Sequence, residues 1–225
     1  MDIRGRVMAK LAAQLGHPRG VPGRVIGRML NRSNKAAIAA AVDALEIPSG
    51  AVVADFGFGG GIGIELLLDR LGDSGQVHGI DRSTTMLAAA AQRFSHEITT
   101  GRLALHQAPI ERLPLATGSV DAAITLNTLY FIADLAGALN ELARVLKPGG
   151  RLVIGLGDPD AMARQTVTAH GFGLRSIAQV TDALRDAGLD VDRDRRVGNG
   201  EDAFHLLVTR RSPDKAGGGP GDRAP

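Results

Sequence analysis

The stretch Ala51-Val-Val-Ala-Asp-Phe-Gly-Phe-Gly-Gly-Gly-Ile-Gly63 decides the fold of this chain. Its apolar, β-branched first half predicts a strand up to Phe56 that is buried on both faces, and Ile62 to Leu71 predicts a helix just past the glycines. Five glycines occupy the seven positions 57–63. Glycine is needed where φ is positive or where a ligand approaches too closely for a Cβ, and a helix start leaves N–H groups unpaired. A simple tight turn seldom needs so many glycines, so we expect a nucleotide-type cofactor here.

Composition narrows the class of protein. A length of 225 residues suits one α/β domain with an extension. The residues are 44% apolar but only 3% aromatic, so Leu, Ile, Val and Ala must form the core. The absence of Cys excludes disulfides, thiolate metal sites and a cysteine nucleophile. The sequence has neither an apolar run long enough to span a membrane nor the apolar core of a secretory signal, so we expect a cytoplasmic protein.

Positive charge is concentrated at the N-terminus. Residues 1–35 contain eight Lys or Arg and one acid, whereas the remaining residues carry a net charge of −5. Helices are predicted from Asp2 to Leu15 and from Lys35 to Leu45, the latter capped by Ser33-Asn34, with an amphipathic segment from Arg24 to Asn31 between them. We expect residues 1–46 to form a basic helical arm. It is either a lid that meets an anionic or amphiphilic substrate, with peripheral membrane contact as a further option, or a structural cover for the core.

Strands and helices alternate through the core, which we place at residues 47–211. After the opening unit, the predicted strands are Gln76–Ile80, Leu103–His106, Val120–Leu126 and Arg151–Leu156, and the predicted helices are Thr84–Phe94, capped by Ser83, and Leu135–Lys147, capped by Asp134. This alternation predicts a parallel sheet with right-handed crossovers.

The end of the core departs from this alternation. A helix is predicted from Ser176 to Ala187, followed by strands Leu189–Val197 and Ala203–Arg210 around a hairpin loop. A hairpin cannot extend a purely parallel sheet, so at least one of its strands runs antiparallel. Residues 212–225 are rich in Gly, Pro and charge, and we expect this tail to be disordered.

Two features restrict the cofactor. Glycines 57, 59, 61 and 63 form G-x-G-x-G-x-G, but the dinucleotide fingerprint needs glycine where Ile62 stands, which disfavours a pyrophosphate cradle. Asp81 lies at a strand end 20 residues past Gly61, where a carboxylate accepts hydrogen bonds from a ribose diol. Nicotinamide and adenosyl cofactors both carry that ribose. The alternative role for Asp81 is to interact with a helix dipole.

Asp55 stands immediately before the glycines. A carboxylate at this point suits a cofactor that carries a cation, such as the methionine ammonium of S-adenosylmethionine. It is alternatively a strand-end acid bonded to backbone amides.

Six short motifs together resemble class I S-adenosylmethionine-dependent methyltransferases, especially the subfamily of quinone-biosynthesis and other small-molecule enzymes. They are Asp55-Phe-Gly-Phe-Gly-Gly-Gly61, Gly79-Ile-Asp-Arg-Ser83, Glu111-Arg-Leu-Pro114, Ser119-Val-Asp-Ala122, Asn127-Thr-Leu-Tyr130 and Leu146-Lys-Pro-Gly-Gly150. The resemblance runs from about Asp43 to Arg210. It implies a Rossmann-like, doubly wound sheet of seven strands, mostly parallel, with an antiparallel last strand.

The resemblance also implies site residues. The methionine part would lie against Asp55 and the backbone of Gly57, Phe58, Gly59 and Gly61, the ribose against Asp81, the adenine along Arg82, Met86 and the Ile110 backbone, and the transferred methyl near Asn127. One motif departs from the family. Relatives often have an Asp that reaches the adenine amino group, whereas this chain has Ala108-Pro-Ile110, so we expect somewhat weaker cofactor binding.

Catalytic residues are poorly marked, because methyl transfer from a sulfonium needs mainly alignment of nucleophile, methyl and sulfur. Asn127 and Tyr130 are the candidates. Tyr130 either orients a substrate hydroxyl or lays its ring against the sulfonium, or else it packs with Phe131. His17 and His170 are candidate bases or ordinary loop residues.

We expect a small-molecule acceptor, apolar or anionic. The lack of Cys excludes covalent cytosine C5 methylation, and nucleic acid is disfavoured because no basic stripe lies outside the arm. Asp158 and Asp160 resemble metal-dependent enzymes only faintly, so no metal is expected. The chain is expected to be a monomer or homodimer. The alternative functions are a Rossmann-type NAD(P)-dependent oxidoreductase and a non-catalytic adenosyl-binding module.

Overall fold

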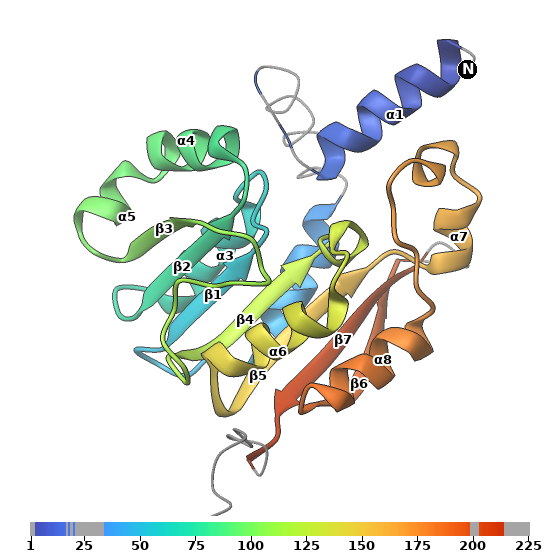
Figure 1. Ribbon diagram of the computed structural model, residues 1–225. Coiled ribbons are helices and arrows are strands. Elements are labelled where there is room, and N and C mark those ends of the chain that lie inside the picture. The colour runs from blue at the N-terminus through green and yellow to red at the C-terminus, as the bar shows by residue number, and fades with distance from the viewer. Residues whose placement is uncertain (1–2, 17, 19, 21–33, 199–202, 214–225) are drawn as a thin grey trace, which may run out of the picture.

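The computed structural model describes residues 3–16, 18, 20, 34–198 and 203–213. Within them lies a seven-stranded sheet in the order β3-β2-β1-β4-β5-β7-β6 (Figure 1). The strands are β1 (Val52–Phe56), β2 (Gln76–Asp81), β3 (Leu103–Gln107), β4 (Val120–Leu126), β5 (Leu146–Leu156), β6 (Leu189–Val197) and β7 (Phe204–Arg211). Neighbours are parallel from β3 to β5, whereas β7 is antiparallel to β5 and β6. The predicted Rossmann-like sheet with an antiparallel last strand is confirmed.

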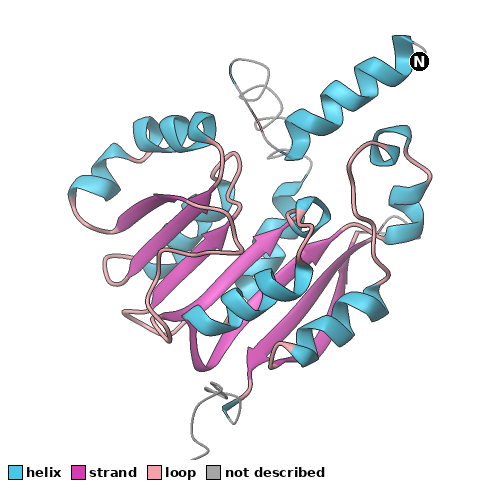
Figure 2. Cartoon of the chain, in the orientation of Figure 1, coloured by secondary structure: helices cyan, strands magenta, loops and turns pink. Residues whose placement is uncertain are grey.

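Helices cover both faces of the sheet (Figure 2). One face packs against residues 34–44, α3 (Ile62–Leu71) and α4 (Thr84–Arg93), and the other against α6 (Leu135–Val145) and α8 (Ile177–Asp186). Successive strand residues point to opposite faces of the sheet. Val53 of β1 therefore packs in the apolar cluster under α3 and α4, and Phe56 packs in the cluster under α6 and α8. Both side chains are fully buried. The doubly wound arrangement follows from this alternation.

The predicted Ser83 and Asp134 caps are present, whereas Ser33, which was also expected to cap a helix, lies outside the described residues. Ser83 Oγ accepts a hydrogen bond from the amide of Met86, and Asp134 caps α6 through the amide of Gly137. Ser176 forms a reciprocal capping box with Gln179 at the start of α8. Each cap satisfies an amide that the first helical turn leaves unpaired.

Two adjoining boundaries differ from the prediction by more than one residue. The helix expected to reach Lys147 ends at Val145, and β5 begins at Leu146 instead of Arg151. A residue before proline is disfavoured in the helical conformation, and Pro148 follows Lys147. Leu146 therefore pairs with Val120 of β4.

Four short elements were not predicted, because one turn is too short to show periodicity. They are α5 (Ser95–Thr99), η1 (Leu129–Phe131), α7 (Pro159–Ala163) and η2 (Thr166–Ala169).

The arm contains α1 (Ile3–Gly16) and the helix of residues 34–44, as predicted. Three predicted segments lie outside the described residues: the amphipathic segment Arg24–Asn31, the hairpin loop residues 199–202, and residues 214–225, which are most of the expected disordered tail.

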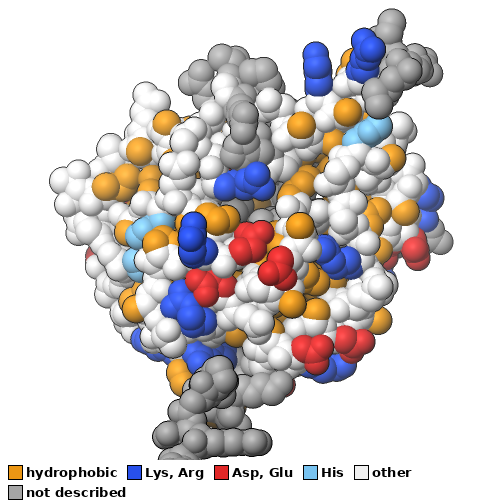
Figure 3. Space-filling model, viewed as in Figure 1, with side chains coloured by type: hydrophobic (Ala, Val, Ile, Leu, Met, Phe, Trp, Pro, Cys, Tyr) orange, Lys and Arg blue, Asp and Glu red, His pale blue; other side chains and the backbone are white. Residues whose placement is uncertain are grey.

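Helix α1 extends away from the sheet (Figure 1), and its sequence has basic but no acidic residues. Figure 3 shows Lys and Arg side chains at the upper right, where α1 lies. No helix in the described part of the chain is long and apolar enough to cross a membrane.

Candidate cofactor and acceptor site

A cavity of about 430 Å³ opens at the carboxyl ends of β1, β2 and β4. Ligands of open α/β sheets bind at this edge, at the point where the strand order changes direction. Here that point is β1, because β2 and β3 extend the sheet on one side of it and β4 extends it on the other. All of the predicted cofactor residues except Gly61 line it, namely Asp55, Gly57, Phe58, Gly59, Asp81, Arg82, Met86, Ile110 and Asn127. Tertiary structure therefore brings together residues from four separate motifs.

Gly57 is required by both backbone and space. Its φ is +75°, and a Cβ built there would lie 2.6 Å from the Thr128 hydroxyl oxygen. Gly61 has φ +80° and is the N-cap of α3, and it has no side chain that could cap the helix. A Cβ on Gly61 would lie 3.1 Å from the Phe94 ring. Gly61 thus shapes the loop and offers the start of α3 no side-chain cap of its own.

Asp81 has its carboxylate held in place by backbone amides. Its Oδ2 accepts from the Gly59 amide at 2.9 Å and its Oδ1 from the Ser83 amide at 2.8 Å. The side chain is buried, with 7% exposed, and it lines the cavity. Each carboxylate oxygen has two acceptor positions, so these bonds leave capacity for a ribose diol.

Asp55 combines both roles considered for it. It lines the cavity, and it also accepts a hydrogen bond from the Ile64 amide at the start of α3. A Cβ on Gly63 would lie 2.1 Å from its Oδ2, so this glycine makes room for the carboxyl group. Burial, and then the nearby charge of Asp81, raises the pKa of Asp55 to about 8. A cationic ligand placed beside it would lower that pKa again.

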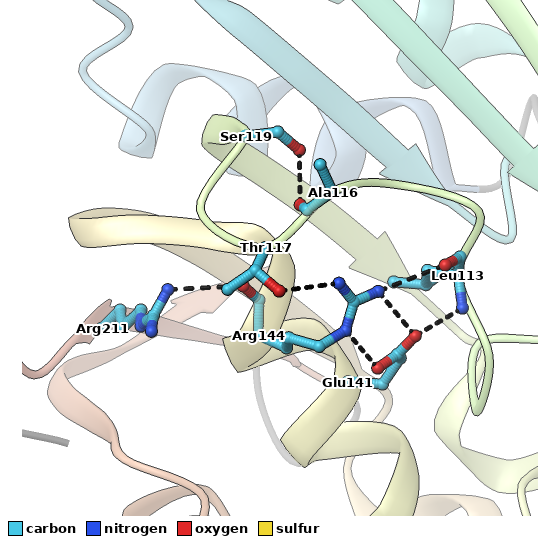
Figure 4. A network of polar contacts seen from close by, with 7 residues as sticks. All are labelled: Leu113, Ala116, Thr117, Ser119, Glu141, Arg144 and Arg211. Atoms are coloured by element: carbon cyan, nitrogen blue, oxygen red, sulfur yellow. Dashed lines mark hydrogen bonds and ion pairs between the residues drawn. The ribbon is translucent and has the colours of Figure 1, made fainter. Parts of the chain in front are cut away.

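The opposite wall of the cavity comes from α4 and from the loop after β3. Met86 of α4 and Ile110 of that loop are buried, and Pro109 and Glu111 also line the cavity. The polar network in Figure 4 anchors the continuation of this loop to α6: Glu141 accepts from the Leu113 amide at 2.7 Å and pairs with Arg144. Sequence reasoning did not find this support, because its partners are distant in the chain.

Asn127 lies at the other end of the cavity, just past β4. It has φ +57°, a left-handed conformation that Asn tolerates better than most residues, and its amide donates to Gly155 O at 2.9 Å. Strained backbone of this kind is concentrated at functional sites. Beyond it, the cavity is lined by Phe131 and Ile132, and by Leu15 and Ile38 of the arm. Sequence reasoning missed these apolar residues as site residues.

Tyr130 is not among the described residues that line the cavity. Its hydroxyl accepts from the Gly157 amide at 2.5 Å, and its ring meets Phe131 edge to face with centroids 6.3 Å apart. Burial raises its pKa above the ordinary tyrosine value. The 3₁₀ turn η1 points Tyr130 into the core and Phe131 toward the cavity, so the geometry favours packing as the role of Tyr130.

The remaining candidates are also away from the cavity or outside the described residues. His17 lies outside them, and His170, after η2, is not among the described lining residues. Asp158 caps α7 through the amides of Asp160 and Ala161 and contacts His205 Nε2 at 3.3 Å. Its interactions are those of a structural residue.

The arm contributes residues to the cavity wall and is tied to the start of α4. Leu15, Gly16 and Pro18 line the cavity. Ser83 Oγ donates to Pro18 O at 2.5 Å, and the Gly20 amide donates to Thr85 Oγ1 at 3.0 Å. The arm is thus tied to the start of α4, next to Asp81.

Known proteins resemble this chain in sequence. The methyltransferase domain family matches residues 54–154. YdaC, an uncharacterised methyltransferase of Bacillus subtilis, is 30% identical over 172 residues, which cover 76% of this chain and 89% of YdaC. The ubiquinone/menaquinone biosynthesis C-methyltransferase UbiE of Syntrophotalea carbinolica is 43% identical over 79 residues, or 35% of this chain and 32% of UbiE. Two further curated relatives are longer proteins, and this chain spans 61% and 46% of their lengths.

A solved structure shares the fold. Geranyl diphosphate C-methyltransferase from Streptomyces coelicolor, in complex with Mg²⁺, geranyl diphosphate and S-adenosyl-L-homocysteine, has a TM-score of 0.67 at 19% identity, covering 88% of this chain and 87% of that one. Since YdaC is matched over most of its length and the fold agrees, the chain belongs to the S-adenosylmethionine-dependent methyltransferase family.

Proposed function

We propose that this chain transfers the methyl group of S-adenosylmethionine to a small apolar acceptor. The observation that carries the proposal is the cavity itself, which has two chemically different ends. One end has the buried carboxyl groups of Asp55 and Asp81 beside the glycine loop at the start of α3, and the other is apolar around Phe131. A nucleoside fits the first end and an apolar acceptor the second.

The residues present fit the methyl donor. Asp81 would accept from the ribose hydroxyls, and Met86, Arg82 and the Ile110 backbone would flank the adenine. Asp55 and the glycine backbone from Gly57 to Gly61 would hold the methionine part. Bound there, the donor supplies an electrophilic methyl group on a sulfonium.

The chain's own contribution to the reaction is orientation. Asn127 lines the cavity just past β4 and would line the path of the methyl group, while the apolar wall excludes water from it. Holding two reactants in line supplies about 7–11 kcal/mol of a barrier of this type. No base is assigned, because among the described residues no histidine lines the cavity.

Relatives support a small acceptor. UbiE is named for quinone C-methylation and the Streptomyces enzyme for methylation of geranyl diphosphate, a molecule with an apolar chain and an anionic head. The apolar residues at the acceptor end of this chain agree with that chemistry. The family assignment leaves the oxidoreductase alternative without support.

The arm, residues 1–46, would act as a lid on the core of residues 47–211. Its ties to Ser83 and Thr85 support closure over the site, and the basic residues of α1 suit an anionic or amphiphilic acceptor at a membrane surface. A cytoplasmic monomer or homodimer is the corresponding proposal for the whole protein.

The test has two stages. Calorimetric titration with S-adenosylmethionine and with NADH should show binding of the first alone. Radiolabelled methyl transfer is then measured with menadiol, geranyl diphosphate and catechol as acceptors. Binding of NADH alone would refute the proposal, and binding of the donor without transfer to any broader acceptor panel would favour the non-catalytic module.

A further inference from the structure

One arginine braces the loop after β4 from the side away from the cavity. Arg175 precedes α8, and its Nη1 donates to Leu129 O at 3.0 Å and to Gly173 O at 3.2 Å. Its Nη2 donates to Ile132 O at 2.9 Å. Among the described residues this guanidinium has no carboxylate partner; its hydrogen bonds go to backbone carbonyls at the two ends of η1 and to that of Gly173.

Two more hydrogen bonds complete the brace. The Gly173 amide donates to Tyr130 O at 2.8 Å, and the Gly157 amide donates to the Tyr130 hydroxyl at 2.5 Å. The ring of Phe172 adds apolar contact, with its centroid 4.7 Å from that of Phe131 and 5.8 Å from that of Tyr130. The segments after β4 and before α8 are therefore joined as one unit.

The other side of the same loop forms the acceptor end of the cavity. Asn127, Thr128, Phe131 and Ile132 line it, whereas Arg175 does not. Phe131 also lies directly against Gly16 of the arm, where an added Cβ would be 2.5 Å from the ring. A small shift of η1 would thus move both the acceptor wall and its contact with the arm.

We propose that Arg175 is a positioning residue for the acceptor, acting through η1 and without touching either reactant. The effect on the acceptor rests on the proposed function, whereas the contacts by which Arg175 holds η1 in place do not. An arginine is required because its planar guanidinium reaches three carbonyls at fixed angles, whereas a lysine ammonium on its flexible stem cannot span the same set. The cofactor end is formed by the segments that follow β1, β2 and β3, none of which Arg175 contacts, so it should not depend on Arg175.

The chain carries its own reporter for this brace. Tyr130 is the only tyrosine and there is no tryptophan, so intrinsic tyrosine fluorescence arises beside the Arg175 contacts and nowhere else. The variants are Arg175→Lys and Arg175→Gln. Arg193→Gln, at an exposed position on β6, is the matched control for loss of one arginine.

Both Arg175 variants should alter the Tyr130 fluorescence and speed hydrogen exchange of the 129–132 amides about tenfold or more, while Arg193→Gln does neither. Affinity for S-adenosylhomocysteine should stay within about threefold of wild type. With an acceptor from the panel above, kcat/KM for the acceptor should fall about tenfold or more while KM for the donor stays within about threefold.

The proposal would be overturned if the Tyr130 fluorescence and the hydrogen exchange of the 129–132 amides were unchanged in the two Arg175 variants. It would also be overturned if Arg175→Lys alone kept the wild-type fluorescence and exchange rates. Faster exchange throughout the sheet, together with loss of S-adenosylhomocysteine binding, would also overturn it and assign Arg175 to general stability. If wild type itself failed to bind S-adenosylhomocysteine, the proposed function would fail while the fluorescence and exchange results still decided whether the brace exists.

Discussion

Replacing Asp55 with Asn tests the electrostatics of the site most directly. Burial and the charge of Asp81 raise the pKa of Asp55 from 3.8 to about 8, so the folded protein keeps the carboxyl group protonated at neutral pH. The unfolded chain ionises it above about pH 4. The unfolded state therefore binds fewer protons than the native state between these values, and Asp55 makes stability fall as pH rises through that window.

The size of the effect follows from the one proton by which the native and unfolded states differ at Asp55. This difference lowers the free energy of unfolding by about 1.4 kcal/mol per pH unit, or by about 2–3 kcal/mol between about pH 5 and about pH 7. An amide at position 55 keeps the shape of the neutral carboxyl group and does not titrate. Asp55→Asn should therefore gain stability over wild type by this amount as pH rises across the interval.

The assay is urea unfolding of both proteins at several pH values without cofactor. The measured quantity is the difference in the free energy of unfolding between wild type and variant, because His78 contributes to the pH dependence of both proteins with the opposite sign. Burial, and then the charge of His106, lowers its pKa to about 4, so the unfolded state binds the extra proton and stability rises with pH toward neutrality. The comparison with the variant cancels that contribution. Parallel pH profiles for the two proteins would refute the assignment of a protonated Asp55.

The remaining predictions concern ligand binding and packing. Asp81→Ala should weaken S-adenosylmethionine binding about tenfold or more while the circular dichroism spectrum stays native, and unchanged affinity in calorimetry would contradict its ribose role. Gly57→Ala should lower the free energy of unfolding more than Gly118→Ala, because both have positive φ but only Gly57 also faces Thr128, whereas nothing lies within 4 Å of a Cβ at Gly118; equal losses in urea unfolding would show that Thr128 yields freely. Deleting residues 1–32 should reduce acceptor turnover much more than donor affinity, and an equal loss of both with a lower Tm would make the arm structural.

Local sequence patterns predicted the units of this fold well. The strand, glycine loop and helix from Ala51 to Leu71 form as expected, because burial periodicity and the need for positive φ act over a few residues. The hairpin likewise required an antiparallel strand, which is β7. The end of α6 was missed although its signal, Pro148, is local.

Side-chain direction at short turns was not predictable. Tyr130 and Phe131 are adjacent and both apolar, and the sequence does not show which one faces the cavity. The 3₁₀ geometry of η1 and the hydrogen bond from Gly157 decide it. Arg175 was overlooked for the same reason, since its three acceptors are backbone carbonyls that no sequence pattern marks.

The sequence by itself determined that a glycine loop lies between a buried strand and a helix, that Asp55 and Asp81 stand at two strand ends, and that the sheet closes with a hairpin. These properties depend on local conformational preference and on which residues can be buried. Only the tertiary structure decided that Phe131 and the arm line one cavity with Asp55 and Asp81, that burial raises the pKa of Asp55, and that Arg175 braces η1. Each of these depends on contacts between segments far apart in the chain, and their geometry is set by packing of the whole sheet and its helices.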